Sequence, residues 1–147
     1  MTFQNDPPLI QWKIHLKSSP QAVYQTLSSN EGRARFWAES AVEKDGIIHF
    51  IFPNQAEWQG KILEKDPPRT FKVEYYGGSV TTFELDSDGS GGTDLTLTDQ
   101  GVLQEGRVEV IAGWVSVLMA LKASVDFGVD LRNHDPKRTW DDGYAEN

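Results

Sequence analysis

Cysteine is absent from this chain of 147 residues, which excludes disulfide scaffolds, thiol nucleophiles and cysteine-based zinc sites. Basic residues are few, because 14 lysines and arginines stand against 22 aspartates and glutamates and leave a formal net charge of −8. That charge repels a phosphate backbone, so we expect no nucleic-acid partner. Residues 1–9 contain no lysine or arginine, and no apolar run approaches the roughly 20 residues of a membrane helix. These absences predict a cytoplasmic domain without a membrane span.

The first part of the chain predicts one strand followed by two short helices. Apolar and polar residues alternate over 9–17, which is the period of a strand with one buried face. Ser19 and Pro20 then predict a helix start, because serine caps a helix and proline suits its first position. A second short helix begins near Asn30 and carries the aromatic pair Phe36 and Trp37.

Between residues 38 and 102 the pattern predicts strands and turns only. Turn residues separate short strands at hairpin spacing, which indicates an antiparallel meander. The expected strands are Ser40–Lys44, Ile47–Phe52, Ala56–Glu64, Thr70–Tyr76, Ser79–Leu85 and Thr93–Asp99. Alternation turns a mostly apolar set inward and places these charged side chains on the outer face: Glu57, Lys61, Lys72, Glu74 and Glu84.

One long helix is predicted over residues 105–131, where apolar residues recur at helical spacing. Gly113 lies inside it, and because glycine costs about 1 kcal/mol relative to alanine there, we expect it to allow close approach to a neighbour. The following residues are polar, and we expect them to be loosely held, although Trp140 and Tyr144 can pin them to the body. The chain therefore divides into an extension at 1–8, a domain at 9–131 and a polar tail at 132–147.

These elements predict an α+β fold in which a curved seven-stranded antiparallel sheet surrounds the long C-terminal helix. Only that helix is large enough to cover the apolar face of the sheet. A curved sheet and a helix diverge away from their line of contact, so large side chains or a ligand fill the space between them. We expect this space to be apolar and free of charge.

Four segments carry local motifs in a defined order. They are residues 14–37 with SPQAVYQTL and the pair Phe36-Trp37, GKILEKDPPR at 60–69, TDLTLTDQG at 93–101, and Gly113-Trp114 followed by Leu118, Leu121 and Lys122. Together they resemble the START-like (Bet v 1-like, SRPBCC) superfamily over about residues 10–131. Within it they are most similar to the branch of the C-terminal domain of the activator of Hsp90 ATPase.

The resemblance implies a helix-grip fold with an apolar pocket, and activities that range in the superfamily from lipid carriage to polyketide cyclisation. The fold by itself does not choose among these activities. The chain departs from the family at the end of the last strand, where Asp99-Gln100 occupies a stretch that often ends in histidine. We therefore carry over no role of that histidine.

The ionisable residues predict no metal site. The three histidines His15, His49 and His134 lie on separate elements, and no HxH or HxxxH pair exists. We expect neither a metal nor another cofactor. The residues Asp126, Asp130 and His134 recur every four positions, so on a helix they would share one face. Such a face could bind a cation or relay protons, or it could be a solvated acidic edge, and we favour the solvated edge.

Three functions stay open. We favour a non-enzymatic module that binds an apolar, lipid-like or aromatic small molecule in the sheet-to-helix cavity. Its expected lining is Trp37, Phe50, Trp58, Tyr75, Thr81, Phe83, Trp114, Leu118 and Leu121. The second function is a cyclase or hydratase with Tyr75 or His49 as acid or base. The third, implied by the resemblance, is a module that interacts with Hsp90. Monomer and homodimer both stay open.

Overall fold

The computed structural model describes residues 9–147, so the expected extension at 1–8 lies outside the described residues. The chain begins with β1 (Leu9–Leu16), α1 (Pro20–Ser28) and α2 (Asn30–Ala34), and the long helix α3 (Arg107–Phe127) follows the last strand. Between α2 and α3 lie β2 (Ser40–Lys44), β3 (Ile47–Ile51), β4 (Glu57–Asp66), β5 (Thr70–Glu74), β6 (Val80–Ser87) and β7 (Thr93–Gln100). Two 3₁₀ turns, η1 (Tyr76–Gly78) and η2 (Trp140–Asp142), complete the described elements.

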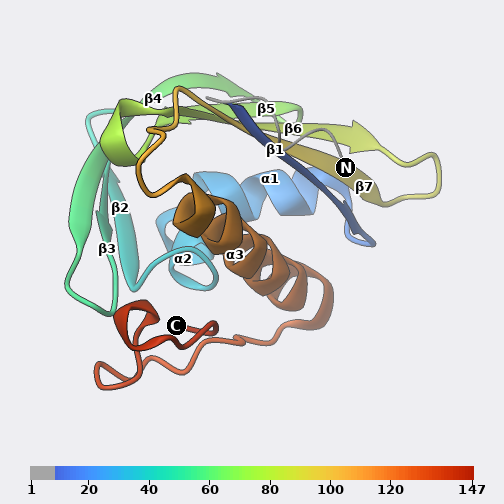
Figure 1. The fold of residues 1–147 in the computed structure, drawn as a ribbon. Helices are drawn as coiled ribbons and strands as arrows, with labels where there is room; N and C mark the ends of the chain where they lie inside the picture. Colours follow the sequence, from blue (N-terminus) through green and yellow to red (C-terminus); the bar gives the residue numbers. More distant parts are fainter. Residues whose placement is uncertain (1–8) are drawn as a thin grey trace.

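The seven strands form one antiparallel sheet in the order β1-β7-β6-β5-β4-β3-β2. The sheet curves around α3, and β2 and β3 turn down beside the first turns of that helix (Figure 1). A register shift between Ile62 and Glu64 of β4 lies next to this bend, as expected because a bulge bends the strand that carries it. The predicted α+β helix-grip architecture is confirmed.

The ends of the helices follow from local chemistry. The Ser19 side chain accepts a hydrogen bond from the Ala22 amide (3.2 Å) and caps α1, with Pro20 at the first position. The long helix ends at Phe127, four residues before the predicted end at residue 131. Gly128 explains the difference, because it takes a left-handed conformation (φ 67°) and its amide and that of Val129 bond back to the helix. This arrangement is a common helix stop.

The core lies between the concave face of the sheet and the helices. Its fully buried side chains include Phe71, Phe83, Leu95 and Leu97 of the sheet, which were all expected to face inward. From α3, the buried residues are Arg107, Trp114, Leu118, Ala120, Leu121 and Ala123. The side of α3 that faces these strands is therefore the covering layer that the sheet requires.

Helix α3 is long and apolar enough, by length and composition, to cross a membrane, with a mean hydropathy of 1.7 over its apolar window. This differs from the sequence-based expectation that no apolar run reaches such a length. Core helices of soluble proteins pass the same test of length and composition, and one side of α3 packs against β1 and α1. No membrane span is shown.

Gly113 of α3 does not support a close contact. A Cβ atom added there would meet no heavy atom within 4 Å, so the expectation that this glycine admits a close neighbour is wrong. The glycine instead borders open space, and that space is the pocket described below.

The polar tail folds back on the domain beside α2 and the first turns of α3 (Figure 1). Arg132 donates to the carbonyl oxygens of Ala34 (2.6 Å) and Ala38 (2.8 Å). Asn54 of the β3–β4 turn donates to Asp141 (3.1 Å). These contacts hold the tail more firmly than its composition suggested.

Candidate functional site

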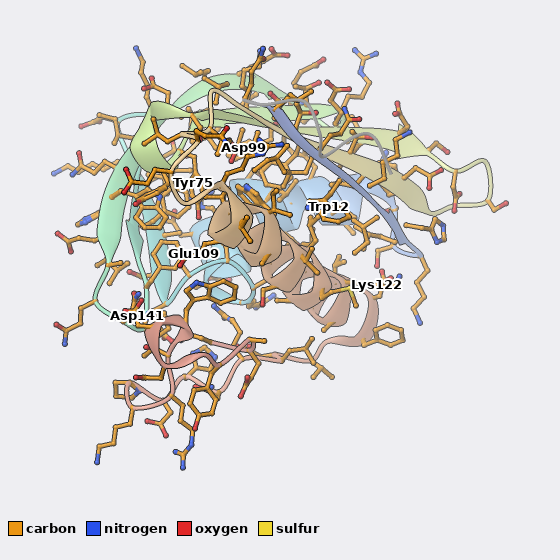
Figure 2. All side chains as sticks on the ribbon, in the orientation of Figure 1. Trp12, Tyr75, Asp99, Glu109, Lys122 and Asp141 are labelled. Atoms are coloured by element: carbon orange, nitrogen blue, oxygen red, sulfur yellow. The ribbon has the colours of Figure 1, made fainter. Side chains whose placement is uncertain are left out.

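A pocket of about 670 Å³ opens between the β3–β4 hairpin, the first half of α3 and the tail. Seven of its nineteen lining residues are aromatic, and its mouth is open to solvent. The lining comprises Trp37, Phe52, Asn54, Gln55, Ala56, Trp58, Tyr75, Tyr76, Gly106, Glu109, Val110, Gly113, Trp114, Ser116, Val117, Trp140, Asp141, Ala145 and Asn147. Figure 2 shows Tyr75, Glu109 and Asp141 on the same side of α3, with Trp12 and Lys122 on the other.

The structure divides the nine predicted ligand-binding residues into two groups. Four of them line the pocket: Trp37, Trp58, Tyr75 and Trp114. The other five are almost fully buried and do not reach it: Phe50, Thr81, Phe83, Leu118 and Leu121. The second group supports the pocket wall from behind, and ligand binding by the first group stays a prediction.

Trp37 is the centre of the aromatic cluster beneath the pocket. Its ring centroid lies 4.9 Å from that of Phe50, 5.5 Å from Tyr75 and 5.4 Å from Phe83. The indole Nε1 of Trp37 donates a hydrogen bond to the Tyr75 hydroxyl (2.9 Å). These rings fill much of the expected space between sheet and helix, so the open volume lies at its edge.

Trp58 forms the outer wall together with two aromatic neighbours. Its ring stacks on Phe52 at 4.4 Å between centroids and lies 4.9 Å from Tyr76. Its indole Nε1 is buried and has no hydrogen-bond partner among residues 9–147, and the same is true of the Asn147 side-chain amide. Buried donors without an acceptor are uncommon in folded proteins. Both of these unpaired donors, Trp58 Nε1 and the Asn147 amide, belong to residues that line the pocket.

The tail supplies a wall that sequence reasoning missed. Trp140, Asp141, Ala145 and Asn147 all line the pocket, and the Ser116 hydroxyl of α3 donates to the Ala145 carbonyl. The amide of Trp140 donates to the Asn147 side chain (2.9 Å). Trp140 was the available signal, because an aromatic side chain in a polar segment usually finds an apolar surface; we expected it to pin the tail, but not to form a pocket wall.

Asp99 is the second feature that sequence reasoning missed. Its side chain is buried, with one oxygen accepting from the Thr81 hydroxyl (3.0 Å) and the other from Trp114 Nε1 (2.8 Å). Burial raises the pKa of this carboxyl, while the hydrogen bonds from Trp114, Ser79 and Thr81 oppose the shift. The core beside the pocket therefore contains an ionisable group, although we expected an apolar interior. Alternation along β7 was the available signal, since Asp99 shares its face with Leu95 and Leu97.

The groups named for acid–base chemistry are poorly placed for it. Tyr75 is half-buried and lines the pocket, and burial raises the pKa of its hydroxyl, so the phenol stays protonated and does not serve as a base. His49 lies outside the pocket and is 3.6 Å from Glu57 on the outer face. Asp99 does not line the pocket. Apart from its two tyrosines, the ionisable side chains that line the pocket within residues 9–147 are two exposed carboxylates at its mouth, Glu109 and Asp141.

The series Asp126, Asp130 and His134 does not form one helix face, because α3 ends at Phe127. Asp126 accepts from the amides of Lys17 and Ser18 (both 3.0 Å) and so anchors the end of β1. His134 lies between Asp130 and Glu39, with both nitrogen–oxygen distances at 2.7 Å. Within residues 9–147 no group of three acidic or histidine side chains has the arrangement of a metal site.

Comparison with known proteins identifies the family to which this fold belongs. The family model described as activator of Hsp90 ATPase homolog 1-like protein matches residues 17–126. A search of curated proteins finds no significant match.

Solved structures share the fold at low sequence identity. The Aha1 dimer from Colwellia psychrerythraea is 21% identical with a TM-score of 0.73, over 82% of this chain and 97% of that one. The protein SSP2350 from Staphylococcus saprophyticus is 21% identical with a TM-score of 0.72, over 84% and 96%. CalU16 from Micromonospora echinospora is 23% identical with a TM-score of 0.66, over 82% and 77%. With its matched segment and the helix-grip architecture described above, the chain belongs to the family of activator of Hsp90 ATPase homolog 1-like proteins.

Proposed function

We propose that the protein binds an apolar or aromatic small molecule in the pocket between the β3–β4 hairpin, α3 and the tail. The observation that carries this proposal is the pocket itself, which has about 670 Å³ of space and walls of tryptophan and tyrosine. Ligand pockets have volumes of about 300–1,000 Å³ and are lined mainly by apolar and aromatic side chains with a few polar groups.

The polar groups of the pocket suit recognition by hydrogen bonding. Trp58 Nε1 and the Asn147 amide are buried donors with no acceptor among the described residues, and a ligand oxygen is the kind of group that satisfies them after a small adjustment of the wall. A micromolar ligand requires about 8 kcal/mol of net binding free energy. At about 0.8 kcal/mol for each buried CH₂ group, the ligand needs an apolar body of at least ten carbon-sized groups.

Binding fits this pocket better than catalysis. A cyclase or hydratase requires an acid or base that touches the substrate, whereas Tyr75 stays protonated and so supplies no base, and Asp99 lies beneath Trp114. The two carboxylates at the mouth are exposed to solvent. The proposal therefore assigns the pocket to a carrier or sensor of small molecules.

The direct test is tryptophan fluorescence and calorimetric titration with a fatty alcohol, an uncharged flavonoid and an aromatic polyketide. Saturable binding of at least one probe is expected in the wild type. Gly113→Leu places a side chain in the open space at Gly113, and we expect it to weaken that binding by at least about tenfold, or 1.4 kcal/mol.

Ala112→Leu is the matched control, since the neighbouring Ala112 is exposed and does not line the pocket. It should bind the same probe as the wild type does. Saturable binding that Gly113→Leu leaves unchanged would locate the ligand elsewhere, and no saturable response to any probe would overturn the proposal.

A protein-interaction function is the second candidate, and it rests on exposed apolar side chains. They are Val108, Val115, Met119, Phe127, Val129 and Leu131, on α3 and just after it. Apolar groups gathered on a surface mark interaction sites. The family name points to Hsp90 and one structural relative is described as a dimer. Stimulation of the ATPase activity of purified Hsp90, and light scattering for self-association, test these two partners, and null results in both would remove the candidate.

A further inference from the structure

All formal charge on the pocket lining is of one sign. Glu109 and Asp141 line the pocket, and no lysine, arginine or histidine of the described chain does so. The two carboxylates come from different elements, the first turn of α3 and the tail turn η2. Neither of them takes part in a salt bridge within residues 9–147. The mouth therefore carries negative charge that no neighbouring cation neutralises.

The aromatic walls favour the same sign of ligand. The face of an aromatic ring carries partial negative charge, and it attracts a cation that lies within about 6 Å of the ring centre. Tryptophan is the strongest of these rings in that respect, and Trp37, Trp58, Trp114 and Trp140 all line the pocket. The formal net charge of −8 over the whole chain adds a long-range attraction of cations at low ionic strength.

We propose that the pocket selects a protonated amine that carries an apolar or aromatic body. The body lies among the rings, and the ammonium group lies at the mouth beside Glu109 and Asp141. This inference rests on the proposed binding function and specifies its ligand class. The same charges disfavour a ligand with a carboxylate head group, such as a fatty acid, because like charges repel at short range.

Three probes with the same body and different head groups test this selection: 4-phenylbutylamine, 4-phenylbutanol and 4-phenylbutyrate. Their affinities are measured by calorimetry and tryptophan fluorescence at about pH 7, where the amine and the carboxylate are both charged. We expect the amine to bind at least about tenfold more tightly than the carboxylate, with the alcohol between them. The preference should decrease as salt is raised, because the mouth is exposed and salt screens exposed charges.

A double variant locates the origin of the preference. In Glu109→Gln with Asp141→Asn, the amine and the carboxylate should bind within about threefold of each other. The matched control is Glu84→Gln with Asp86→Asn, which removes the same net charge from exposed positions of β6 outside the pocket. It should keep the preference for the amine.

The outcomes separate this inference from the function on which it rests. Equal binding of the three probes by the wild type would overturn the charge selection and leave the binding function in place. A preference that survives in the pocket double variant, or that disappears in the β6 control, would also overturn it, because the cation would then respond to the acidic surface as a whole. Failure of all three probes to bind would count against both.

Discussion

Replacement of Asp99 tests whether the buried carboxyl organises the region beneath the pocket. In Asp99→Ala, the Thr81 hydroxyl and Trp114 Nε1 both lose their acceptor, and both side chains are almost fully buried. Water cannot replace the carboxylate without entering the core. We therefore expect a large loss of stability from a change of one small side chain.

The size of the loss is worked from the two donors with the hydrogen-bond distances given above, those of Thr81 and Trp114. A buried donor left without an acceptor costs about 1–3 kcal/mol, so two of them cost about 2–6 kcal/mol. Removal of the carboxyl also relieves its own desolvation, which is the main cause of its raised pKa. We expect a net loss in the free energy of unfolding of about 2–4 kcal/mol. At about 2–4 °C per kcal/mol for a domain near this size, the melting temperature should fall by roughly 4–16 °C.

The assay is thermal and urea unfolding of Asp99→Ala beside Asp94→Ala. Asp94 lies on the same strand but is exposed on the opposite face, and an exposed substitution of this kind changes stability by about 0.5 kcal/mol or less. Asp99→Asn should lie between the two, since its amide oxygen accepts from one donor while its amide nitrogen faces the other. Equal stability of the two alanine variants would refute the reasoning.

The pH dependence gives Asp99 a second signature. Because the pKa of Asp99 is raised in the folded state above its ordinary value of 3.8, the folded protein holds this proton more tightly than the unfolded chain does. The resulting stabilisation is present at low pH and is lost as the pH rises from 3.8 through the folded pKa. Asp99→Asn should lack this decline, and an unchanged pH profile in that variant would contradict the assignment.

Two further predictions concern Gly113 and His134. Gly113→Ala should raise the free energy of unfolding by about 1 kcal/mol, because alanine has the higher helix propensity and its Cβ meets no atom within 4 Å; urea unfolding measures this, and a loss of stability would show that the site is not open. Hydrogen bonding to Asp130, and then interactions with Glu39, raises the pKa of His134 above 6.5. Protonated His134 therefore stabilises the folded protein fully below pH 6.5, and this contribution is lost as the pH rises through the folded pKa. The difference in melting temperature between the wild type and His134→Gln should therefore shrink as the pH rises through that range, and a constant difference would contradict this.

The structure separates the aromatic residues that line the pocket from those buried behind its wall. The alternation of apolar and polar residues along a strand does not predict this difference. Phe50 and Phe83 face inward, as expected, and so does Tyr75, yet only Tyr75 reaches the pocket. The period of a strand states which face a side chain takes. The period does not show which side chains on that face are covered by the helix and which border the pocket.

Local patterns were enough to determine the order of elements and the face that each strand buries. A period of two, a serine cap before proline and turn residues at hairpin spacing depend on neighbours in the chain, and so they can be read without a structure. The meander, the two short helices and the long final helix followed from them. Element ends were less well placed. Helix α2 ends at Ala34, before the pair Phe36-Trp37 that it was expected to carry. Helix α3 ends four residues early because Gly128 takes a left-handed conformation.

Only the tertiary structure decided the pocket. Its walls come from the turn after α2, the β3–β4 hairpin, the segment at Tyr75 and Tyr76, α3 and the tail, and their meeting depends on how strongly the sheet bends and where the tail returns. The negative charge at the mouth of the pocket also depends on tertiary packing. Glu109 and Asp141 are 32 positions apart in the sequence, and no helix or strand periodicity relates them. A site built from separate elements exists only once those elements pack together. That packing depends on contacts between residues that are far apart in the sequence, and local sequence patterns do not report such contacts.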